Sequence, residues 1–252
     1  MGHPEQLAFV EIIGKNVKAD ESFSAIEIGS YDVNGNTRGK FSGNVNWIGV
    51  DLVSGPGVDI VNFGHKVDFD DNSFDISISC ECFEHDPHWV ETFRNMVRMT
   101  KPSGIVLFTC ASKGRPEHGT TRSQPNLSPG TQAVGVDYYS NLSKTDFERN
   151  FQLDDDFSEY RFFYNSITFD LYFVGQKNGR LNTSFVFPTE NELRHIRGIT
   201  PIPHLLVRIP LYVLLRVTPA RIYNEVAFRY WKLLVKIETR VFSGRQIRLD
   251  NR

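Results

Sequence analysis

Apolar positions along the chain follow a helical spacing in some segments and form short continuous runs in others. Residues 4–18 carry apolar side chains on one helical face, which predicts an amphipathic helix leading into the first strand. These side chains are Leu7, Phe9, Val10, Ile13 and Val17. Apolar runs bounded by Gly, Asn, Asp and Ser come next. They predict strands at residues 24–29, 46–51, 57–61, 74–80 and 104–110.

The clearest helical pattern spans residues 86–99. Asp86 suits the cap of this helix and Pro87 its first turn. Its buried stripe is predicted to be Trp89, Phe93, Met96 and Val97. A shorter helix is predicted near residues 143–150, because Ser143 is followed three residues later by Asp146.

Two extended segments, 161–165 and 167–175, are joined by a tight turn, and residues 113–136 form a long Gly-, Pro- and Ser-rich loop. Alternation of strands and helices predicts a doubly wound α/β sheet with right-handed crossovers. Ligands of such sheets bind beyond the carboxyl ends of the strands. The loops that matter for binding are therefore 29–36, 51–57, 62–66, 79–88 and 111–136.

Two neighbouring segments indicate the class of ligand. The first, residues 25–30, is an apolar strand that ends in a turn at Gly29, where a missing Cβ allows close approach to the backbone. The second, residues 47–51, ends in Asp51, about 20 residues on, where an acid accepts hydrogen bonds from ribose hydroxyls. Further glycines of a pyrophosphate-binding turn are missing, and Glu27 would repel a phosphate. A nucleoside without phosphates, such as S-adenosylmethionine, fits this pattern.

Five segments in this order resemble a class I S-adenosylmethionine-dependent methyltransferase of the small-molecule type. They are the acid-x-Gly turn at Glu27 and Gly29, the strand ending in Asp51, Val67 to Asp75, Phe83-Glu84-His85, and Met99 to Gly104. The resemblance covers residues 20–178 and implies a Rossmann-like sheet of seven mostly parallel strands. Asn34-Gly35 with Arg38, and residues 109–120, also resemble a bacterial subgroup linked with surface-glycan synthesis. The implied division is a methyltransferase domain at 1–180 and a basic helical extension at 181–252.

The resemblance places the cofactor among residues of the first four strands. Asp51 is expected to bind ribose, with a helix cap or a loop acid as the alternative, and Gly29 is expected to lie against the methionine moiety. Glu27 is expected to meet the cofactor ammonium through loop amides or water, and Phe63 to contact adenine. The whole predicted cofactor set is Glu27, Gly29, Ser30, Asp51, Leu52, Phe63, Gly64, Cys80 and Glu81.

Methyl transfer needs a base only if the acceptor is a hydroxyl that must lose its proton. His118, in the polar loop after the fifth strand, and His85, after the fourth, are the candidates. A structural hydrogen bond is the alternative role for His85. No metal is predicted, since His85, Asp86 and His88 are near-consecutive turn positions that rarely converge on one ion.

Charge is distributed unevenly along the 252 residues, whose net charge is −2. Residues 201–252 hold ten Lys or Arg against three acids, a balance of +7, while the rest of the chain is acidic. Apolar residues at helical spacing among these basic groups suit a helix on an anionic membrane. A helical appendage that packs on the body or forms a homodimer is the open alternative. Nucleic-acid binding is not expected, because no recognition motif accompanies the basic residues.

Three cysteines, two of them in Cys80-Glu81-Cys82, do not form a disulfide framework, and residues 1–6 lack a signal pattern. A cytoplasmic protein, with the inner membrane face as an option, is therefore expected. The predicted function is transfer of a methyl group from S-adenosylmethionine to a small-molecule or lipid-linked glycan acceptor, on oxygen. The alternatives are a non-catalytic adaptor with this fold and an NAD(P)-dependent oxidoreductase, against which the missing glycines argue.

Overall fold

The computed structural model describes residues 3–17, 23–33, 35–179 and 185–249, and the side chains of these residues except 235 and 237–249. Asn34, which contributes to the resemblance to the glycan subgroup, lies outside the described residues, as do the side chains at the end of the basic tail.

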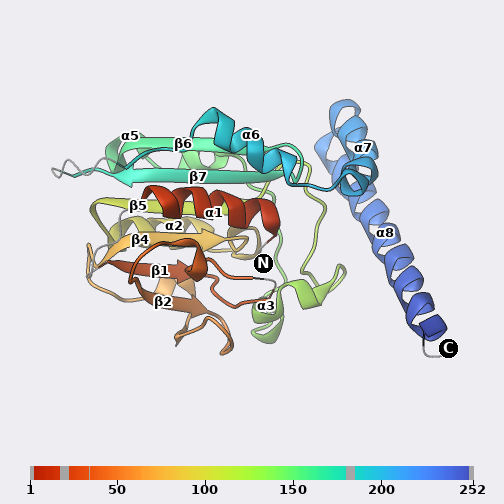
Figure 1. Cartoon of the computed structure of the whole chain (residues 1–252), viewed down its shortest axis with the longest axis horizontal. Coiled ribbons are helices and arrows are strands. Elements are labelled where there is room, and N and C mark those ends of the chain that lie inside the picture. The colour runs from red at the N-terminus through yellow and green to blue at the C-terminus, as the bar shows by residue number, and fades with distance from the viewer. Residues whose placement is uncertain (1–2, 18–22, 34, 180–184, 250–252) are drawn as a thin grey trace.

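One sheet of seven strands organises the described chain, in the order β3-β2-β1-β4-β5-β7-β6 (Figure 1). Neighbouring strands are parallel except β7, which runs antiparallel to β5 and β6. The strands are β1 (Ser24–Ile28), β2 (Asn46–Asp51), β3 (Ile60–Val61), β4 (Phe74–Cys80), β5 (Thr100–Ala111), β6 (Phe157–Asn165) and β7 (Asp170–Lys177). The predicted doubly wound, mostly parallel seven-stranded sheet is therefore confirmed.

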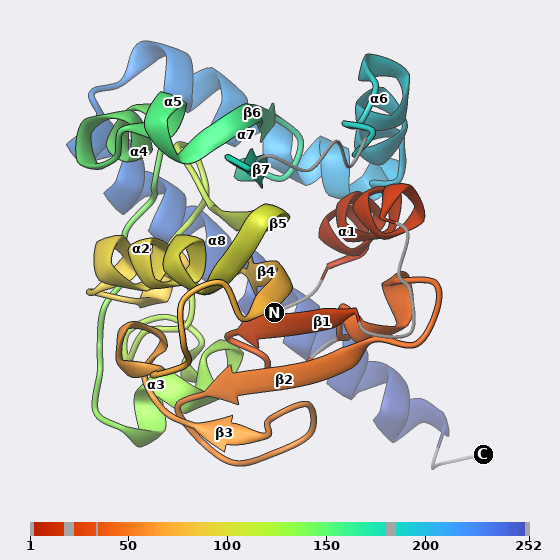
Figure 2. The same cartoon turned by 90° about the vertical axis from the view of Figure 1, so that its left-hand side faces the viewer.

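Helices cover both faces of this sheet, with α1 and α6 on one face and α2, α4 and α5 on the other (Figure 2). The helices are α1 (Pro4–Asn16), α2 (Trp89–Met99), α3 (Pro129–Ala133), α4 (Lys144–Asn150), α5 (Leu153–Asp156), α6 (Glu190–Gly198), α7 (Ile202–Val217) and α8 (Ala220–Leu249). Single-turn 3-10 helices also occur: η1 (Arg38–Lys40), η2 (Gly64–Lys66), η3 (Phe83–His85) and η4 (Pro125–Leu127).

The two-residue period of the strands divides the core into two layers. On β1, Ile26 and Ile28 pack with the α2 layer, whereas Ala25 packs with the α1 layer. The α2 layer is rich in phenylalanine, and its predicted helical stripe at Trp89, Phe93, Met96 and Val97 is buried. The α1 layer also takes in α6, which lies beyond the predicted boundary at residue 180. That boundary stays a prediction.

Several predicted element ends were wrong, and local backbone geometry or contacts explain two of the differences. Helix α2 begins at Trp89 rather than Asp86, whose carboxylate accepts hydrogen bonds from the His88 amide at 2.8 Å and the Thr92 hydroxyl. The strand expected at 57–61 is reduced to Ile60–Val61, because Gly57 adopts φ +83° in a turn. The loop expected at 113–136 contains η4 and α3. The capping box of Ser143 and Asp146 at α4 is as predicted.

The tail helices α7 and α8 pack beyond the carboxyl ends of the parallel strands (Figure 1). They form a small third core with the turn before β7, in which Phe169, Leu211, Tyr223 and Ala227 are buried. Hydrogen bonds fix this contact: Tyr223 donates to the Gly114 carbonyl at 2.6 Å, and the Arg208 guanidinium donates to the Ile167 carbonyl at 2.8 Å. The predicted helical extension is therefore present and is attached to the body.

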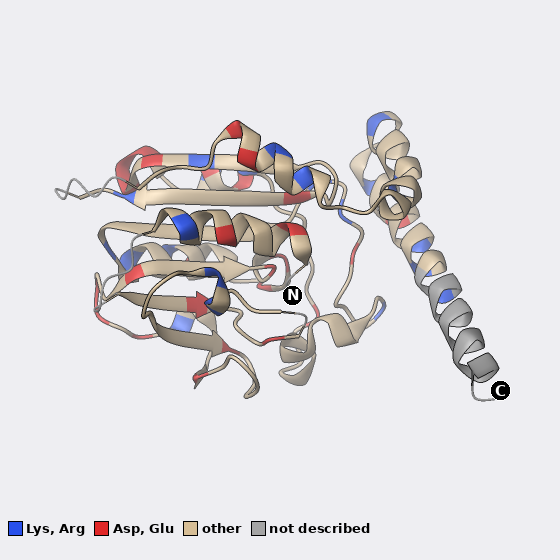
Figure 3. Ribbon diagram, viewed as in Figure 1, with Lys and Arg blue, Asp and Glu red and all other residues tan. Residues whose placement is uncertain are grey.

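The outer surface of the tail is apolar and basic. Large apolar side chains stand exposed on it: Ile202, Leu206, Val207, Ile209, Val213, Val217, Ile222, Val226 and Leu233. Lys and Arg lie among them, with few acids (Figure 3). Among the described helices, none alone has the length and apolar character of a membrane span, but α6 and α7 together do, with a 99° bend between them.

Candidate functional site

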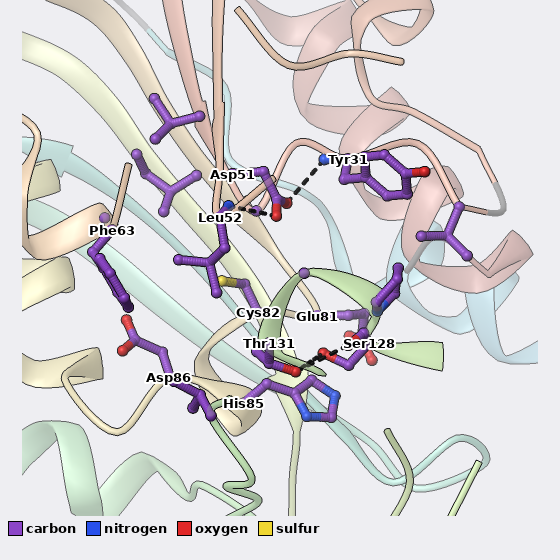
Figure 4. Close-up of a pocket in the computed structure, with 18 of the residues that line it drawn as sticks. Tyr31, Asp51, Leu52, Phe63, Glu81, Cys82, His85, Asp86, Ser128 and Thr131 are labelled. Carbon is purple, nitrogen blue, oxygen red and sulfur yellow. Dashed lines mark hydrogen bonds between the residues drawn. The ribbon is translucent and has the colours of Figure 1, made fainter. Parts of the chain in front are cut away.

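A pocket opens at the carboxyl ends of β1, β2 and β4, where the predicted binding loops meet (Figure 4). Six of the predicted cofactor residues line it: Gly29, Asp51, Leu52, Phe63, Gly64 and Glu81. His85, one of the two candidate catalytic histidines, lines it as well. The segment at 127–136 closes the opposite wall, so the long loop after β5 folds back over the pocket.

Asp51 is fixed at the end of β2 by two backbone amides. The Tyr31 amide donates to Oδ2 at 3.1 Å and the Leu52 amide donates to Oδ1 at 2.7 Å (Figure 4). Burial raises the pKa of Asp51, and the two amides act in the opposite direction. A Cβ on Gly130 would stand 2.6 Å from Oδ1, so α3 covers this end of the pocket at a distance that only glycine permits.

Gly29 forms the predicted turn with φ +81°, a conformation that favours glycine. A side chain at this position would clash with the protein itself, since a Cβ on Gly29 would lie 2.8 Å from the Cβ of Cys82. Cys82 itself lines the pocket, as does Asp86, which points toward Phe63 (Figure 4). The sequence interpretation left both out of the predicted set. The position of Cys82 just after β4, within the predicted binding loop 79–88, was the signal that could have found it.

The opposite end of the pocket is built by Phe63 and Gly64. The Asn95 amide donates to the Gly64 carbonyl at 3.0 Å, which holds η2 against α2. A carboxylate at one end and an aromatic ring at the other, with glycine turns between them, fit a nucleoside such as that of S-adenosylmethionine. These residues would hold it, and its methyl-bearing end would then face Glu81 and His85.

Glu81 stands at the mouth of β4 with a left-handed backbone, φ +50°, which is strained for a glutamate. Burial alone would raise its pKa, but hydrogen bonding and charge from His3, with Arg115 nearby, hold that pKa well below its usual range. The His3 imidazole lies 3.8 Å from Glu81 and 3.0 Å from Asp170. Glu81 is therefore an ionised carboxylate, and its Oε1 has no hydrogen-bond partner in the part of the chain that the structure describes.

Three predicted cofactor residues lie outside the pocket lining. Glu27 and Cys80 alternate onto the α1 face of the sheet, and both are buried there. Ser30 is also buried, beside Gly49. Burial raises the pKa of Glu27 to about 7 and that of Cys80 to about 12.

The two candidate catalytic histidines are packed together. His85 lines the pocket, and His118 lies behind it, with their ring centroids 5.1 Å apart. The Pro116 carbonyl, 3.1 Å from Nδ1 of His118, can only accept a hydrogen bond, so in the neutral ring Nδ1 carries the proton and Nε2 is the unprotonated nitrogen. Burial lowers the pKa of His85 to about 4 and that of His118 well below its usual range. Both rings are neutral at physiological pH.

Glu84 completes this group and does not line the pocket. Its side chain is fully buried, and neither carboxyl oxygen has a hydrogen-bond partner among the described residues. Burial, followed by the neighbouring charge of Glu81, raises its pKa well above the usual range.

A model of a methyltransferase domain matches residues 46–108, which run from β2 into β5 and include most of the pocket. The search of curated proteins gave no match. The match indicates a methyltransferase domain in this part of the chain, in agreement with the sequence prediction.

Solved structures are similar at low identity. A chain of the Haloferax volcanii complex between the Trm112 methyltransferase activator and a methyltransferase is 13% identical, with 71% of this chain and 92% of that chain covered and a TM-score of 0.47. Haemonchus contortus phosphoethanolamine N-methyltransferase 2 is 16% identical, with 70% and 53% covered and a TM-score of 0.48. The YcgJ protein of Bacillus subtilis is 15% identical, with 68% and 98% covered and a TM-score of 0.46. Likenesses of this size carry no argument about the acceptor.

Proposed function

We propose that this methyltransferase methylates a hydroxyl oxygen of a small-molecule or glycan-type acceptor. The observation that carries the proposal is the pair of buried, neutral histidines beside the pocket, His85 and His118. A hydroxyl must lose its proton during the transfer, whereas an amine attacks as a free base. A neutral imidazole with an unprotonated ring nitrogen is the group that such an acceptor needs.

The bound cofactor supplies a methyl carbon already activated by its sulfonium. In the proposal, Asp51 binds the ribose hydroxyls, Phe63 packs on adenine, and the ionised Glu81 faces the cofactor ammonium. The enclosing segment at 127–136 excludes water and holds the acceptor oxygen in line with the methyl group. An unprotonated nitrogen of the histidine pair then accepts the hydroxyl proton as the carbon–oxygen bond forms.

The reaction class is tested by incubating the protein with labelled cofactor and the polar fraction of a cell extract. We expect label in a methyl ether, found by mass spectrometry after hydrolysis to the component sugars or alcohols. Label confined to a methylated amine would overturn the proposal. His118→Ala should lower turnover without weakening S-adenosylhomocysteine binding in calorimetry, with the exposed His195→Ala as its matched control.

We further propose that the tail holds the enzyme at the inner face of an anionic membrane, near a lipid-linked acceptor. The exposed apolar side chains of α7 and α8 stand beside exposed basic groups such as Arg216 and Arg221. Each basic group near such a surface contributes about 1 kcal/mol, and salt screens this attraction. The tail also packs over the acceptor side of the body, so a surface-bound tail would bring that side to the lipid.

The membrane proposal is tested with vesicles of anionic or zwitterionic lipid. Binding should require anionic lipid, weaken at high salt, and fall in Arg216→Glu/Arg221→Glu but not in the body variant Arg149→Glu. Truncation at Thr200 is a poorer test, because it also exposes the third core at Phe169. No vesicle binding together with a dimer in solution would replace the membrane with a homodimer through the tail.

A further inference from the structure

A second reactive cluster lies behind the pocket wall and is built by Glu84, His85 and His118. Each offers one ligand atom, and these atoms all lie within 4.8 Å of one another. Glu84 and His85 come from η3 at the end of β4, and His118 comes from the loop after β5. The sequence argued against a metal on His85, Asp86 and His88, but the fold brings together a different set.

The hydrogen bonds of the two histidines leave one ring nitrogen of each available. Nδ1 of His118 donates to the Pro116 carbonyl. His85 forms a hydrogen bond with the Tyr138 backbone, and its own Nδ1 has no partner among the described residues. Metal-binding histidines are held in this way, with one ring nitrogen donating to a backbone carbonyl and the other on the metal.

Glu84 gives the independent indication that a cation belongs here. Both of its carboxyl oxygens are buried, and no hydrogen bond or ion pair within the described chain reaches them. A buried carboxyl without a partner is costly, and nearly all such groups are hydrogen-bonded, paired or bound to a metal.

A neighbouring cluster of His3, Glu81 and Asp170 has similar spacing, but its carboxylates do not require a metal ion. There the imidazole already bridges the two carboxylates, and the Arg115 guanidinium lies 3.4 Å from Asp170. Protein cations therefore pair with that cluster, whereas no Lys, Arg or His among the described residues forms an ion pair with Glu84.

We propose that Glu84, His85 and His118 bind a divalent transition-metal ion beside the methyl-donor pocket. Two imidazole nitrogens and one carboxylate oxygen suit Zn²⁺ and its first-row neighbours, and three protein ligands leave a position open. His85 lines the pocket, and in this inference the open position takes the acceptor. The inference deepens the proposed function and rests on it for the role of the metal.

In this role the ion would coordinate the acceptor hydroxyl oxygen and lower the pKa of the hydroxyl, so that its proton passes to solvent. The oxygen then forms its bond to the methyl carbon. The carbon–sulfur bond breaks and its electron pair goes to sulfur, which leaves S-adenosylhomocysteine. His118 would act in this scheme as a ligand rather than as the base itself.

The test measures metal binding directly. The full chain is stripped with a chelator and titrated with Zn²⁺ against a chromophoric competitor, and with Co²⁺ for its visible absorption. We expect a single tight equivalent in the parent, loss of it in Glu84→Gln and in His118→Ala, and retention in His195→Ala. Glu84→Gln keeps the shape of the side chain, and S-adenosylhomocysteine calorimetry checks that each variant is folded.

Equal Zn²⁺ binding by the parent and Glu84→Gln, or no tight site in the parent, would overturn the inference. The proposed function fails separately. Methyl ether formation that continues in the stripped enzyme leaves hydroxyl methylation standing without a metal. Tight Zn²⁺ binding together with methylation of amines only would leave the metal site standing and remove the proposed acceptor class.

Discussion

The two halves of the pocket edge are built in different ways. At the cofactor half, the groups that face the ligand are fixed by strand ends and backbone amides, as with Asp51 between the Tyr31 and Leu52 amides. At the half where the proposal places methyl transfer, here called the acceptor half, the groups are ionisable side chains brought from distant segments: Glu81 lines the pocket, and His3 and His118 lie behind it. Local sequence defines the first half, and tertiary packing defines the second.

The largest effect is expected at Asp51. Asp51→Ala removes the carboxylate proposed to bind two ribose hydroxyls, and each charge-assisted hydrogen bond is worth about 1.5–3 kcal/mol. Affinity for S-adenosylhomocysteine should therefore fall at least tenfold in calorimetry. The exposed Asp68→Ala is the control. Unchanged affinity in Asp51→Ala would mean that the cofactor half does not bind ribose at the end of β2.

The next prediction concerns Glu27, which lies in the cofactor half but outside the pocket lining. Burial raises its pKa from 4.5 to about 7, so between these values the folded state keeps a proton that the unfolded chain releases. The free energy of unfolding should therefore be highest below this window and fall by about 3 kcal/mol as the pH rises through it.

Glu27→Gln should remove this part of the pH dependence, measured by urea unfolding between pH 5 and about 7.5. The exposed Glu148→Gln should keep it. Saturating S-adenosylhomocysteine tests the sequence interpretation in the same experiment. If the bound ligand removes the pH dependence of the free energy of unfolding in the parent, its ammonium interacts with Glu27. Glu27 would then belong to the cofactor site, as the sequence predicted.

A smaller effect is expected at the glycine turn. Gly29→Ala forces an alanine into φ +81° with its Cβ 2.8 Å from that of Cys82, and strained backbones of this kind cost about 1–3 kcal/mol. Gly39→Ala is the matched control, because its Cβ would meet no atom within 4 Å. Equal unfolding midpoints for the two variants would show that the turn tolerates a side chain.

This contrast explains how much could be predicted from the sequence. The strands β1, β2 and β4, the turn at Gly29 and the acid at Asp51 follow from local periodicity and single-residue chemistry. The capping box at Ser143 is equally local. Such features need no knowledge of what packs against them.

The remaining features depend on contacts between distant segments. Nothing near Glu81 in the sequence indicates that His3 will pair with it, because the pairing requires α1 to dock on the sheet. The cover of α3 over Asp51 needs the whole loop after β5 to fold back. Strand alternation already places the side chains of Glu27 and Cys80 on the face away from the pocket. They were predicted as cofactor residues because they lie close in sequence to Gly29 and Glu81.

The smallest predicted effect tests whether the tail belongs to the acceptor half. The Tyr223 hydroxyl donates to the carbonyl of Gly114, in the loop that leads to His118. Tyr223→Phe should cost about 1 kcal/mol of stability, because the bond is lost and the carbonyl is left unpaired. Tyr230→Phe is a matched control, since the Tyr230 hydroxyl donates at 2.7 Å to the Val207 carbonyl within the tail itself.

Both variants lose one hydrogen bond, but only Tyr223→Phe loosens the loop. We therefore expect it alone to raise the KM for the acceptor, with cofactor affinity unchanged. A weakened cofactor affinity in Tyr223→Phe would show that the two halves of the pocket edge are coupled through the loop after β5.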